Sequence, residues 1–409
     1  MRKKIVTLLT VALLMMLCAG VFSACKKESA VKELNIYNWT EYIDEEIIDE
    51  FETWYEEVTG EKIEVNYYGE FETNEQMVEL FDSSEFAGDL VCISDYAIES
   101  LVNRNLVKVI DKTNAAVKPN YNYFNNIEKE IYAKGDDFKY NLSDYYLPYS
   151  YGTLGIMYDT EVITKKEAEN AGYGLLWNSL NKTELNGGIY MKNSLRDSYA
   201  AAALYLREQG ALPSKFSKYT IGELISSADD ELIAFVEKAL IDQKQFLSGN
   251  GTAGGCVYIS DGLAEYIDYT ELSMPVALMW SGEAISIIEE HPKYAYFVPK
   301  SGGNFFFDGF VIPKAAKNPE AAQFFLSFLC RPDIAVRNSV VVGYGSAVNK
   351  EILKGNSEAC ALLLEAGYDI DEFFADSIRY PSYAKLALMQ DFTKNKEEIL
   401  GMWEGILTS

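Results

Sequence analysis

LNIYNWTEY, residues 34–42, is the most informative segment of this sequence. It is an apolar run that ends abruptly in Trp39, Thr40, Glu41 and Tyr42. The run predicts a β-strand with two aromatic rings and a carboxylate at its end. An organic cation needs both groups, since a ring face attracts positive charge and an acid supplies a charge-assisted hydrogen bond. The segment alone fits equally well an edge strand that leads into an acidic helix.

Helical and extended patterns alternate after this segment. Apolar residues at helical spacing, with Asp44 as a cap and Gly60 as a stop, predict a helix over 44–58. Strands are expected at 63–67 and 89–94, and helices at 75–81 and 96–102. This order is typical of a parallel α/β sheet, in which ligands bind beyond the carboxyl ends of the strands. Ser94 and Tyr96 are therefore expected to lie beside residues 39–42.

A second α/β series begins after residues 148–152. The expected strands are 154–158, 188–191, 276–280, 294–298 and 305–312, and the expected helices are 199–207, 283–289 and one that starts at 318. One or two amphipathic helices are expected within 382–403. About 375 residues of folded chain exceed what one hydrophobic core usually serves, so we expect two lobes.

The N-terminus has the pattern of an export signal. Arg2, Lys3 and Lys4 precede an uncharged, mostly apolar stretch at 5–22, which leads to Ser23, Ala24 and Cys25. Small residues before a cysteine resemble a bacterial lipobox, so residues 1–24 are expected to be removed and Cys25 to carry lipid. The alternative is a transmembrane anchor, since ~18 to 20 apolar residues can span a bilayer. Either outcome places the remaining chain outside the cytoplasm, with residues 25–32 as a tether.

The charge of the chain is strongly acidic. Its 36 basic and 62 acidic residues give a net charge of −26. Loss of three cations with the export signal would take the remainder from −26 to −29. Nucleic acids and anionic membrane surfaces are therefore disfavoured as partners, because phosphates require positive charge. Such a surface is usually a matter of solubility, although it also attracts polycations.

The usual residues of catalytic and metal centres are scarce. His291 is the only histidine, which excludes zinc sites that need two histidines and leaves any histidine-based triad to rest on this residue. Cys92, Cys256, Cys330 and Cys360 are widely spaced, with no CxxC pair, and the first and third lie in apolar runs typical of buried thiols. Paired acids could still hydrolyse a glycoside. We expect no enzyme activity, no cofactor and no metal.

Seven segments together resemble the polyamine-binding proteins of ABC importers, the spermidine/putrescine receptor family. They are IYNWTEY at 36–42, DLVCISDYAI at 89–98, YYLPYSYGTLGIMYD at 145–159, MWSGEA at 279–284, GGNFFFDGFVIP at 302–313, FLCRPDIA at 328–335 and VGYGSAVN at 342–349. The similarity extends over about residues 33–409.

The resemblance implies an α/β, two-lobed, type II periplasmic-binding-protein fold with a ligand cleft between the lobes. The first lobe would comprise 33–152 and 308–350, and the second 153–307 and 351–409. The function implied is capture of a polyamine, putrescine or spermidine, by a monomer that delivers it to an ABC permease. The alternatives are a receptor for another organic cation or small solute, and a protein that presents its ligand to a membrane sensor.

The ligand-binding positions implied by the family motifs are Trp39, Thr40, Glu41, Tyr42, Ser94, Tyr96, Asp197, Ser260, Trp280, Phe306, Asp308, Tyr344 and Gln390. Two positions depart from the spermidine receptors. Phe306 replaces a tryptophan, and Ser194 stands where an acid commonly meets the internal amine of spermidine. Phe306 keeps an aromatic wall with a weaker face for cations, whereas Ser194 puts spermidine in doubt as the preferred ligand and leaves putrescine, or another short diamine, open. Segments 120–141 and 246–270 are longer than in the family core.

Overall fold

The computed structural model describes residues 31–71, 73–84, 86–111, 142–248, 256–259, 274–390, 392 and 395–408. Within these residues an eleven-stranded sheet has the order β2-β1-β3-β9-β4-β7-β5-β6, while β8 and β10 pair with β4, and β11 pairs with β9. The strands are β1 (Lys32–Trp39), β2 (Ile63–Phe71), β3 (Leu90–Ser94), β4 (Tyr146–Asp159), β5 (Ile189–Lys192), β6 (Val257–Ile259), β7 (Val276–Trp280), β8 (Tyr294–Phe297), β9 (Gly303–Val311), β10 (Gly345–Ser346) and β11 (Leu386–Ala387).

Helices pack around this sheet. They are α2 (Glu46–Thr59), α3 (Asn74–Leu80), α4 (Asp95–Asn103), α7 (Lys165–Ala171), α8 (Leu195–Glu208), α9 (Ile221–Ile225), α10 (Asp230–Ser248), α12 (Ser281–Glu290), α13 (Pro319–Leu329), α14 (Pro332–Val342), α15 (Lys350–Gly355), α16 (Ser357–Glu365), α17 (Ile370–Ala375) and α18 (Lys396–Thr408). Their ends follow local chemistry. Gly60 closes α2 with a φ of 74°, a conformation that costs glycine little, and Thr73 caps α3 in a capping box with Gln76.

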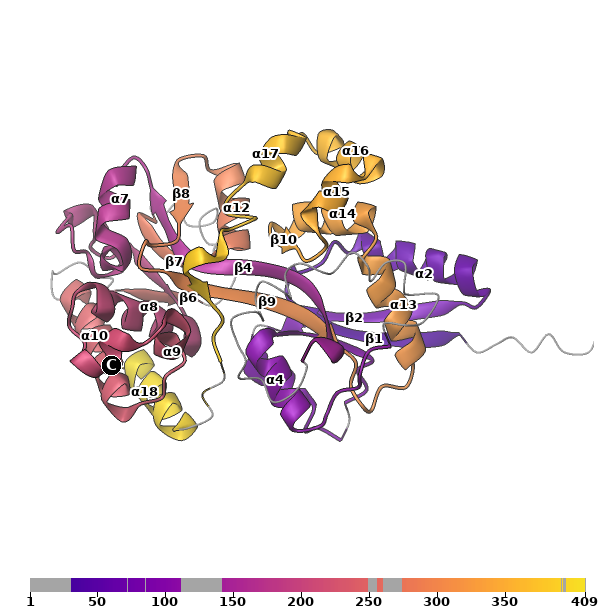
Figure 1. The fold of residues 1–409 in the computed structure, drawn as a ribbon, viewed down its shortest axis with the longest axis horizontal. Helices are drawn as coiled ribbons and strands as arrows, with labels where there is room; N and C mark the ends of the chain where they lie inside the picture. Colours follow the sequence, from indigo (N-terminus) through magenta and orange to yellow (C-terminus); the bar gives the residue numbers. More distant parts are fainter. Residues whose placement is uncertain are drawn as a thin grey trace, which may run out of the picture.

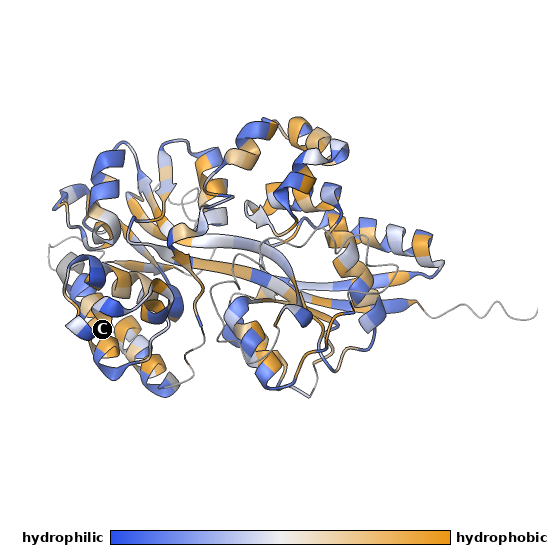
Figure 2. Cartoon of the chain, in the orientation of Figure 1, coloured by the Kyte–Doolittle hydropathy of each residue, from blue (hydrophilic) through white to orange (hydrophobic). Residues whose placement is uncertain are grey.

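The molecule has two halves, joined by β4 and β9, which run side by side from one half to the other (Figure 1). One core contains buried residues of β1, β3, β4 and β9, together with Phe51 and Phe325, whose ring centres are 4.9 Å apart. Another contains the buried face of α8 and residues of β5 and β7. All fourteen residues of β4 are buried. The helices around the sheet carry both hydrophilic and hydrophobic residues, as packing by one face requires (Figure 2).

The first segment forms the expected strand. β1 pairs in parallel with both β2 and β3, and it ends at Trp39. β9 then joins the sheet antiparallel to β3, so that Asp308 lies opposite Ser94. The α/β alternation expected from the sequence is confirmed, and it brings residues from distant parts of the chain to the same sheet edge.

Part of the C-terminal region packs in the other half from the one that was expected. Residues 351–409 were expected in the second lobe, yet the buried side chains of α15, α16 and α17, among them Leu353 and Phe374, join the core around Phe51. Only the later part, including Met389 and Trp403, packs with the other core. Amphipathic periodicity indicates that a helix has a buried face, but it does not indicate which core receives that face.

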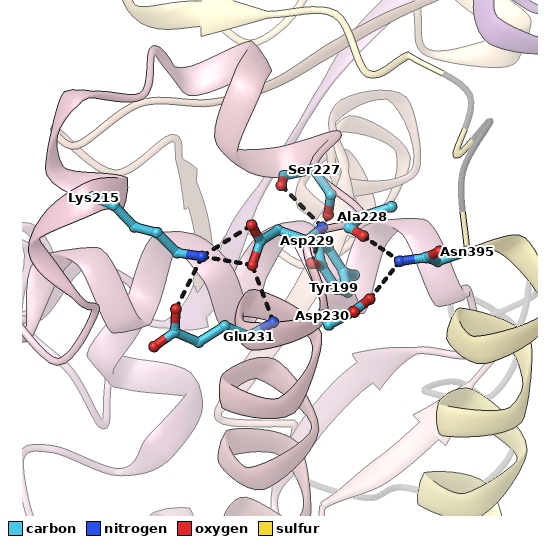
Figure 3. A network of polar contacts seen from close by, with 8 residues as sticks. All are labelled: Tyr199, Lys215, Ser227, Ala228, Asp229, Asp230, Glu231 and Asn395. Atoms are coloured by element: carbon cyan, nitrogen blue, oxygen red, sulfur yellow. Dashed lines mark hydrogen bonds and ion pairs between the residues drawn. The ribbon is translucent and has the colours of Figure 1, made fainter.

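Of the one or two helices expected within 382–403, the structure describes one α-helix, which begins late in this range. Residues Tyr383–Lys385 form a short 3-10 turn, β11 follows, and the helix α18 begins only at Lys396. α18 is joined to the second half through Asn395, which donates hydrogen bonds to the Ala228 carbonyl and to Asp230 (Figure 3).

The free thiols have the expected environment. Cys92 and Cys330 are buried, as their apolar runs predicted, and Cys256 is buried as well. Cys360 is partly exposed. In the part of the chain that the structure describes, no helix is both long and apolar enough to cross a bilayer.

Candidate functional site

A cavity of about 870 Å³ lies where strand ends from the two halves meet β9. That size falls in the range of small-molecule sites. Eleven of the thirteen expected ligand-binding residues line it: Trp39, Thr40, Glu41, Tyr42, Ser94, Tyr96, Asp197, Trp280, Phe306, Asp308 and Tyr344. We refer to this cavity as the cleft.

The other expected residues do not contribute in the described structure. Gln390 is exposed and does not line the cleft; its backbone carbonyl instead accepts a hydrogen bond from Arg196. Ser260 and the lipidation candidate Cys25 lie outside the described residues, as do all of 120–141 and most of 246–270. Gln390 and Ser260 were the less certain assignments, because the residues around them align more loosely with the family.

Asp308 is the acid at one end of the cleft. One of its carboxylate oxygens accepts a hydrogen bond from the Tyr42 hydroxyl at 2.8 Å, and the other accepts one from Ser94 Oγ at 2.6 Å. Asn74 donates to the same Ser94 oxygen at 3.0 Å, which directs the serine proton toward Asp308. Burial raises the pKa of Asp308 to about 6, while the two hydroxyl donors act in the opposite direction. At neutral pH this carboxylate is charged, and its hydrogen-bond partners are neutral.

Hydrogen bonds hold the backbone of Tyr42 in place. Its backbone carbonyl accepts a hydrogen bond from the Tyr149 hydroxyl at 2.6 Å, and Asn338 donates to that hydroxyl at 2.8 Å. The preceding residue, Glu41, is exposed and has a φ of 51°, which is uncommon for a residue other than glycine. Such backbone conformations concentrate at functional sites, and here the turn directs Tyr42 toward Asp308.

An aromatic row forms one wall of the cleft. The rings of Tyr42 and Tyr344 are 5.3 Å apart, those of Tyr344 and Phe306 are 6.1 Å apart, and those of Phe306 and Trp280 are 6.4 Å apart. Each pair is edge-to-face, an arrangement that suits aromatic quadrupoles. The row runs from the Asp308 end of the cleft to a second acidic end, where Asp197 lies.

Gly282 allows the middle of this row to form. A Cβ atom at Gly282 would lie 2.3 Å from two carbons of the Tyr344 ring, closer than packed atoms approach. Gly343, immediately before Tyr344, has a φ of 76° and terminates α14. Gly282 of the MWSGEA motif and Gly343 of the VGYGSAVN motif therefore both serve the position of one aromatic side chain.

The second end of the cleft is organised around Trp280 and Asp197. The indole N–H of Trp280 donates to Asp197 at 3.1 Å. The ammonium of Lys192 lies 3.6 Å from the centre of the Trp280 ring and 2.8 Å from a carboxylate oxygen of Glu283. The side chains of Lys192 and Glu283 are 4% and 15% exposed, so this ion pair is largely shielded from water. A cation of the protein thus already covers one face of Trp280.

A second cation, Arg196, adjoins this end. Its guanidinium lies 3.9 Å from the ring centre of Tyr96 and 4.7 Å from that of Phe392. Burial raises the pKa of Asp197, while Ser194, Lys192 and Arg196 act to lower it. The environment of Asp197 therefore contains two positive charges.

Asp95, which also lines the cleft, is a further buried acid. It accepts hydrogen bonds from the backbone N–H groups of Tyr96 and Phe307 at 2.6 and 3.4 Å. Burial raises its pKa to about 8, the nearby charge of Asp308 contributes to the rise, and Arg196 opposes it. Asp95 is consequently mostly neutral at pH 7, so of these two buried acids it is Asp308 that carries the charge.

Sequence reasoning missed several lining residues, notably Asn74, Lys192, Arg196 and Glu283. Lys192 follows directly after the expected strand at 188–191. The same rule that singled out Ser94 and Tyr96, namely that residues after strand ends face the ligand, would have identified it. Glu283 stood inside a quoted motif. Its pairing with Lys192 depends on how β5 and β7 are arranged, which the sequence did not indicate.

Comparison with known proteins agrees with this architecture. The sequence profile of the family described as bacterial extracellular solute-binding protein matches residues 46–359. The spermidine/putrescine-binding periplasmic protein of Escherichia coli is 26% identical over 312 residues, 76% of each chain. The putrescine-binding periplasmic protein PotF of Escherichia coli is 26% identical over 353 residues, 85% of each chain.

A solved structure titled as a putative spermidine/putrescine ABC transporter from Listeria monocytogenes has the same fold. It superposes with a TM-score of 0.67 at 24% identity, over 92% of this chain and 98% of that one. The two-lobed periplasmic-binding-protein fold expected from the sequence is confirmed, and so is the resemblance to polyamine-binding proteins. With more than half of its length matched by the family profile, the chain belongs to the bacterial extracellular solute-binding proteins.

Proposed function

We propose that this protein is the substrate-binding lipoprotein of an ABC importer and that it captures a polyamine, putrescine or spermidine, in the cleft. The observation that carries the proposal is Asp308, a buried carboxylate whose hydrogen bonds come from the neutral hydroxyls of Tyr42 and Ser94. Among the described residues, no lysine or arginine forms an ion pair with it. A buried, uncompensated negative charge is costly, and an ammonium group of the ligand would offset that cost.

The rest of the cleft suits the body of such a ligand. A polyamine at neutral pH consists of methylene segments between ammonium groups. The aromatic row from Tyr42 to Trp280 provides an apolar surface along which methylenes can lie. Ring faces that meet an ammonium contribute ~0.5 to 2 kcal/mol each when desolvated. Micromolar affinity corresponds to about −8 kcal/mol, which a few such contacts and one buried ion pair can supply after the ordering cost.

The division into lobes and the partner follow from the same proposal. The two halves would close over the ligand, and the closed form would dock on a membrane permease. Cys25 would anchor the mature chain through lipid. Replacement by Ser is expected to abolish incorporation of a labelled fatty acid and to release the protein from the membrane; unchanged membrane retention in Cys25→Ser would contradict the anchor.

The decisive test is calorimetric titration of residues 26–409, freed of bound amines, with putrescine, cadaverine, spermidine and spermine. Micromolar or tighter binding of at least one amine supports the proposal. Absence of heat with all four would leave the fold in place and move the ligand to another class of organic cation or small solute. γ-Aminobutyrate and a neutral sugar serve as control ligands, since neither offers two ammonium groups.

An enzyme is a weaker candidate. The relatives are solute-binding proteins by name. His291 lies at the end of α12 with its ring against Tyr294, and it does not line the cleft. No group of three potential metal ligands occurs within the described ranges.

A further inference from the structure

The lysine inside the cleft has no evident place in a receptor for polycations. Lys192 ends β5, and its ammonium reaches the Glu283 carboxylate at 2.8 Å and the Trp280 ring centre at 3.6 Å. A carboxylate beside an aromatic face is the same pair of groups that an amine ligand would use. The protein has thus placed an ammonium of its own in a site of that chemistry.

The geometry shows that this ammonium is held firmly. The Lys192 side chain is 4% exposed, and Glu283 projects from the first turn of α12, directly after the strand that carries Trp280. The other polar contact of Trp280, its indole N–H, is made with Asp197. One face of the Trp280 ring and its N–H edge are therefore in use by the protein.

We propose that Lys192 acts as a built-in ammonium that sets the length of the ligand. A long polyamine laid from Asp308 along the aromatic row would bring an ammonium toward Trp280, where Lys192 already lies and repels it. A short diamine avoids this encounter. Lys192 is then a specificity-determining residue that excludes triamines, and this inference rests on the proposed function.

The test is titration of wild type and Lys192→Met with putrescine and spermidine. Methionine keeps an unbranched apolar side chain without the charge. The variant exposes Glu283 to the ligand, so its spermidine-to-putrescine affinity ratio should rise by at least about tenfold. A ratio within twofold of wild type in a folded Lys192→Met protein would overturn the inference.

Lys293 offers a matched control. Its ammonium pairs with Asp159 at 3.0 Å and lies 4.9 Å from the Tyr294 ring centre, yet it does not line the cleft. Lys293→Met removes the same kind of contact elsewhere in the same half, and its affinity ratio should equal that of wild type. A rise equal to that of Lys192→Met would overturn the inference by showing that any loss of a lysine has this effect.

Removing Lys192 alone takes this ion-pair partner from the largely buried Glu283 carboxylate, which lowers stability. The double variant Lys192→Met with Glu283→Gln avoids this charge. It frees the ring of Trp280 without supplying an acid, so the ratio should still rise, by about threefold, and no rise would overturn the inference. If wild type binds neither amine, the proposed function fails first; if wild type binds and neither variant changes the ratio, only the role of Lys192 fails.

Discussion

The two ends of the cleft contain the same kinds of groups in different states. At one end, the Asp308 carboxylate is buried and its partners are two neutral hydroxyls. At the other, Asp197 is bound to the Trp280 indole, and the charges of Lys192 and Arg196 act on it. Residue types alone would make the two ends equivalent, since each has an acid beside aromatic rings. The difference teaches that a carboxylate attracts a cationic ligand only to the extent that the protein has left its charge uncompensated.

The largest effect is expected when the uncompensated charge of Asp308 is removed. Asp308→Asn should weaken diamine binding by at least about tenfold, because it eliminates the charge-assisted hydrogen bond. The apo protein should melt no lower than wild type at pH 7.5, since a buried charge is lost. Titration and thermal melting measure the two effects. Asp371→Asn, at an acid that is 82% exposed, is the control and should bind as wild type does. Unchanged affinity in Asp308→Asn would remove Asp308 from the site.

Lowering the pH should have a similar, slightly smaller effect. Since burial raises the pKa of Asp308 to about 6, the apo cleft loses most of this charge at pH 5, and affinity should fall about tenfold relative to pH 7.5. The folded state holds this proton more tightly than the unfolded chain does. The stabilisation that comes from protonation of Asp308 in the folded state is therefore present below about pH 4 and is lost as the pH rises toward 6. Titrations at both pH values, with Asp308→Asn as the control, check the assignment; an equal loss in that variant would contradict it.

The aromatic row that joins the two ends can be disturbed without altering a charge. Gly282→Ala should push Tyr344 aside and weaken binding several-fold, with a loss of about 1 to 3 kcal/mol in stability from overpacking. Gly405→Ala is a helix control in open space, where alanine should stabilise by up to ~1 kcal/mol. Titration and denaturant unfolding separate the outcomes. Equal affinities in the two variants would show that Tyr344 does not contact the ligand.

The smallest expected effect concerns Ser194, at the end of the cleft where Asp197 lies. Ser194 caps α8 by accepting a hydrogen bond from the Asp197 N–H, and aspartate caps helices equally well. Ser194→Asp should therefore preserve the fold and raise the spermidine-to-putrescine affinity ratio a few-fold, which parallel titrations would show. Asn356→Asp, at the cap of α16, provides a matched change far from the cleft. An unshifted ratio in Ser194→Asp would refute the role given to residue 194.

The first end of the cleft was predictable from the sequence to a large degree. The strand that ends at Trp39 pairs in parallel with the strand that ends at Ser94. Parallel strands bring their carboxyl ends to one edge of the sheet, so the residues after these two strands lie close together. The family motifs supplied Asp308, Phe306 and Tyr344, which come from later segments. That these residues line one cavity was expected, and the structure brings them together.

The second end was harder to predict for physical reasons. Lys192 lies on a strand, where successive side chains alternate between faces, so its orientation depends on register. Its ion pair with Glu283 joins residues that are 91 positions apart. Likewise, the apolar faces of α15 to α17 could have packed on either half. Pairings between distant residues and the choice between two cores are settled by tertiary packing, on which local periodicity is silent.

The pairing of β4 with β9 has a mechanical consequence. These strands are paired over residues 146–153 of β4, so a change of angle between the halves must bend a two-stranded ribbon rather than two independent chains. The register shifts just after Pro148, and such irregularities are where a ribbon bends most easily. Tyr149 lies at that point and donates its hydroxyl proton to the Tyr42 carbonyl. The place where the ribbon bends most easily is thus connected to the site, because Tyr42 also donates its hydroxyl proton to the Asp308 carboxylate.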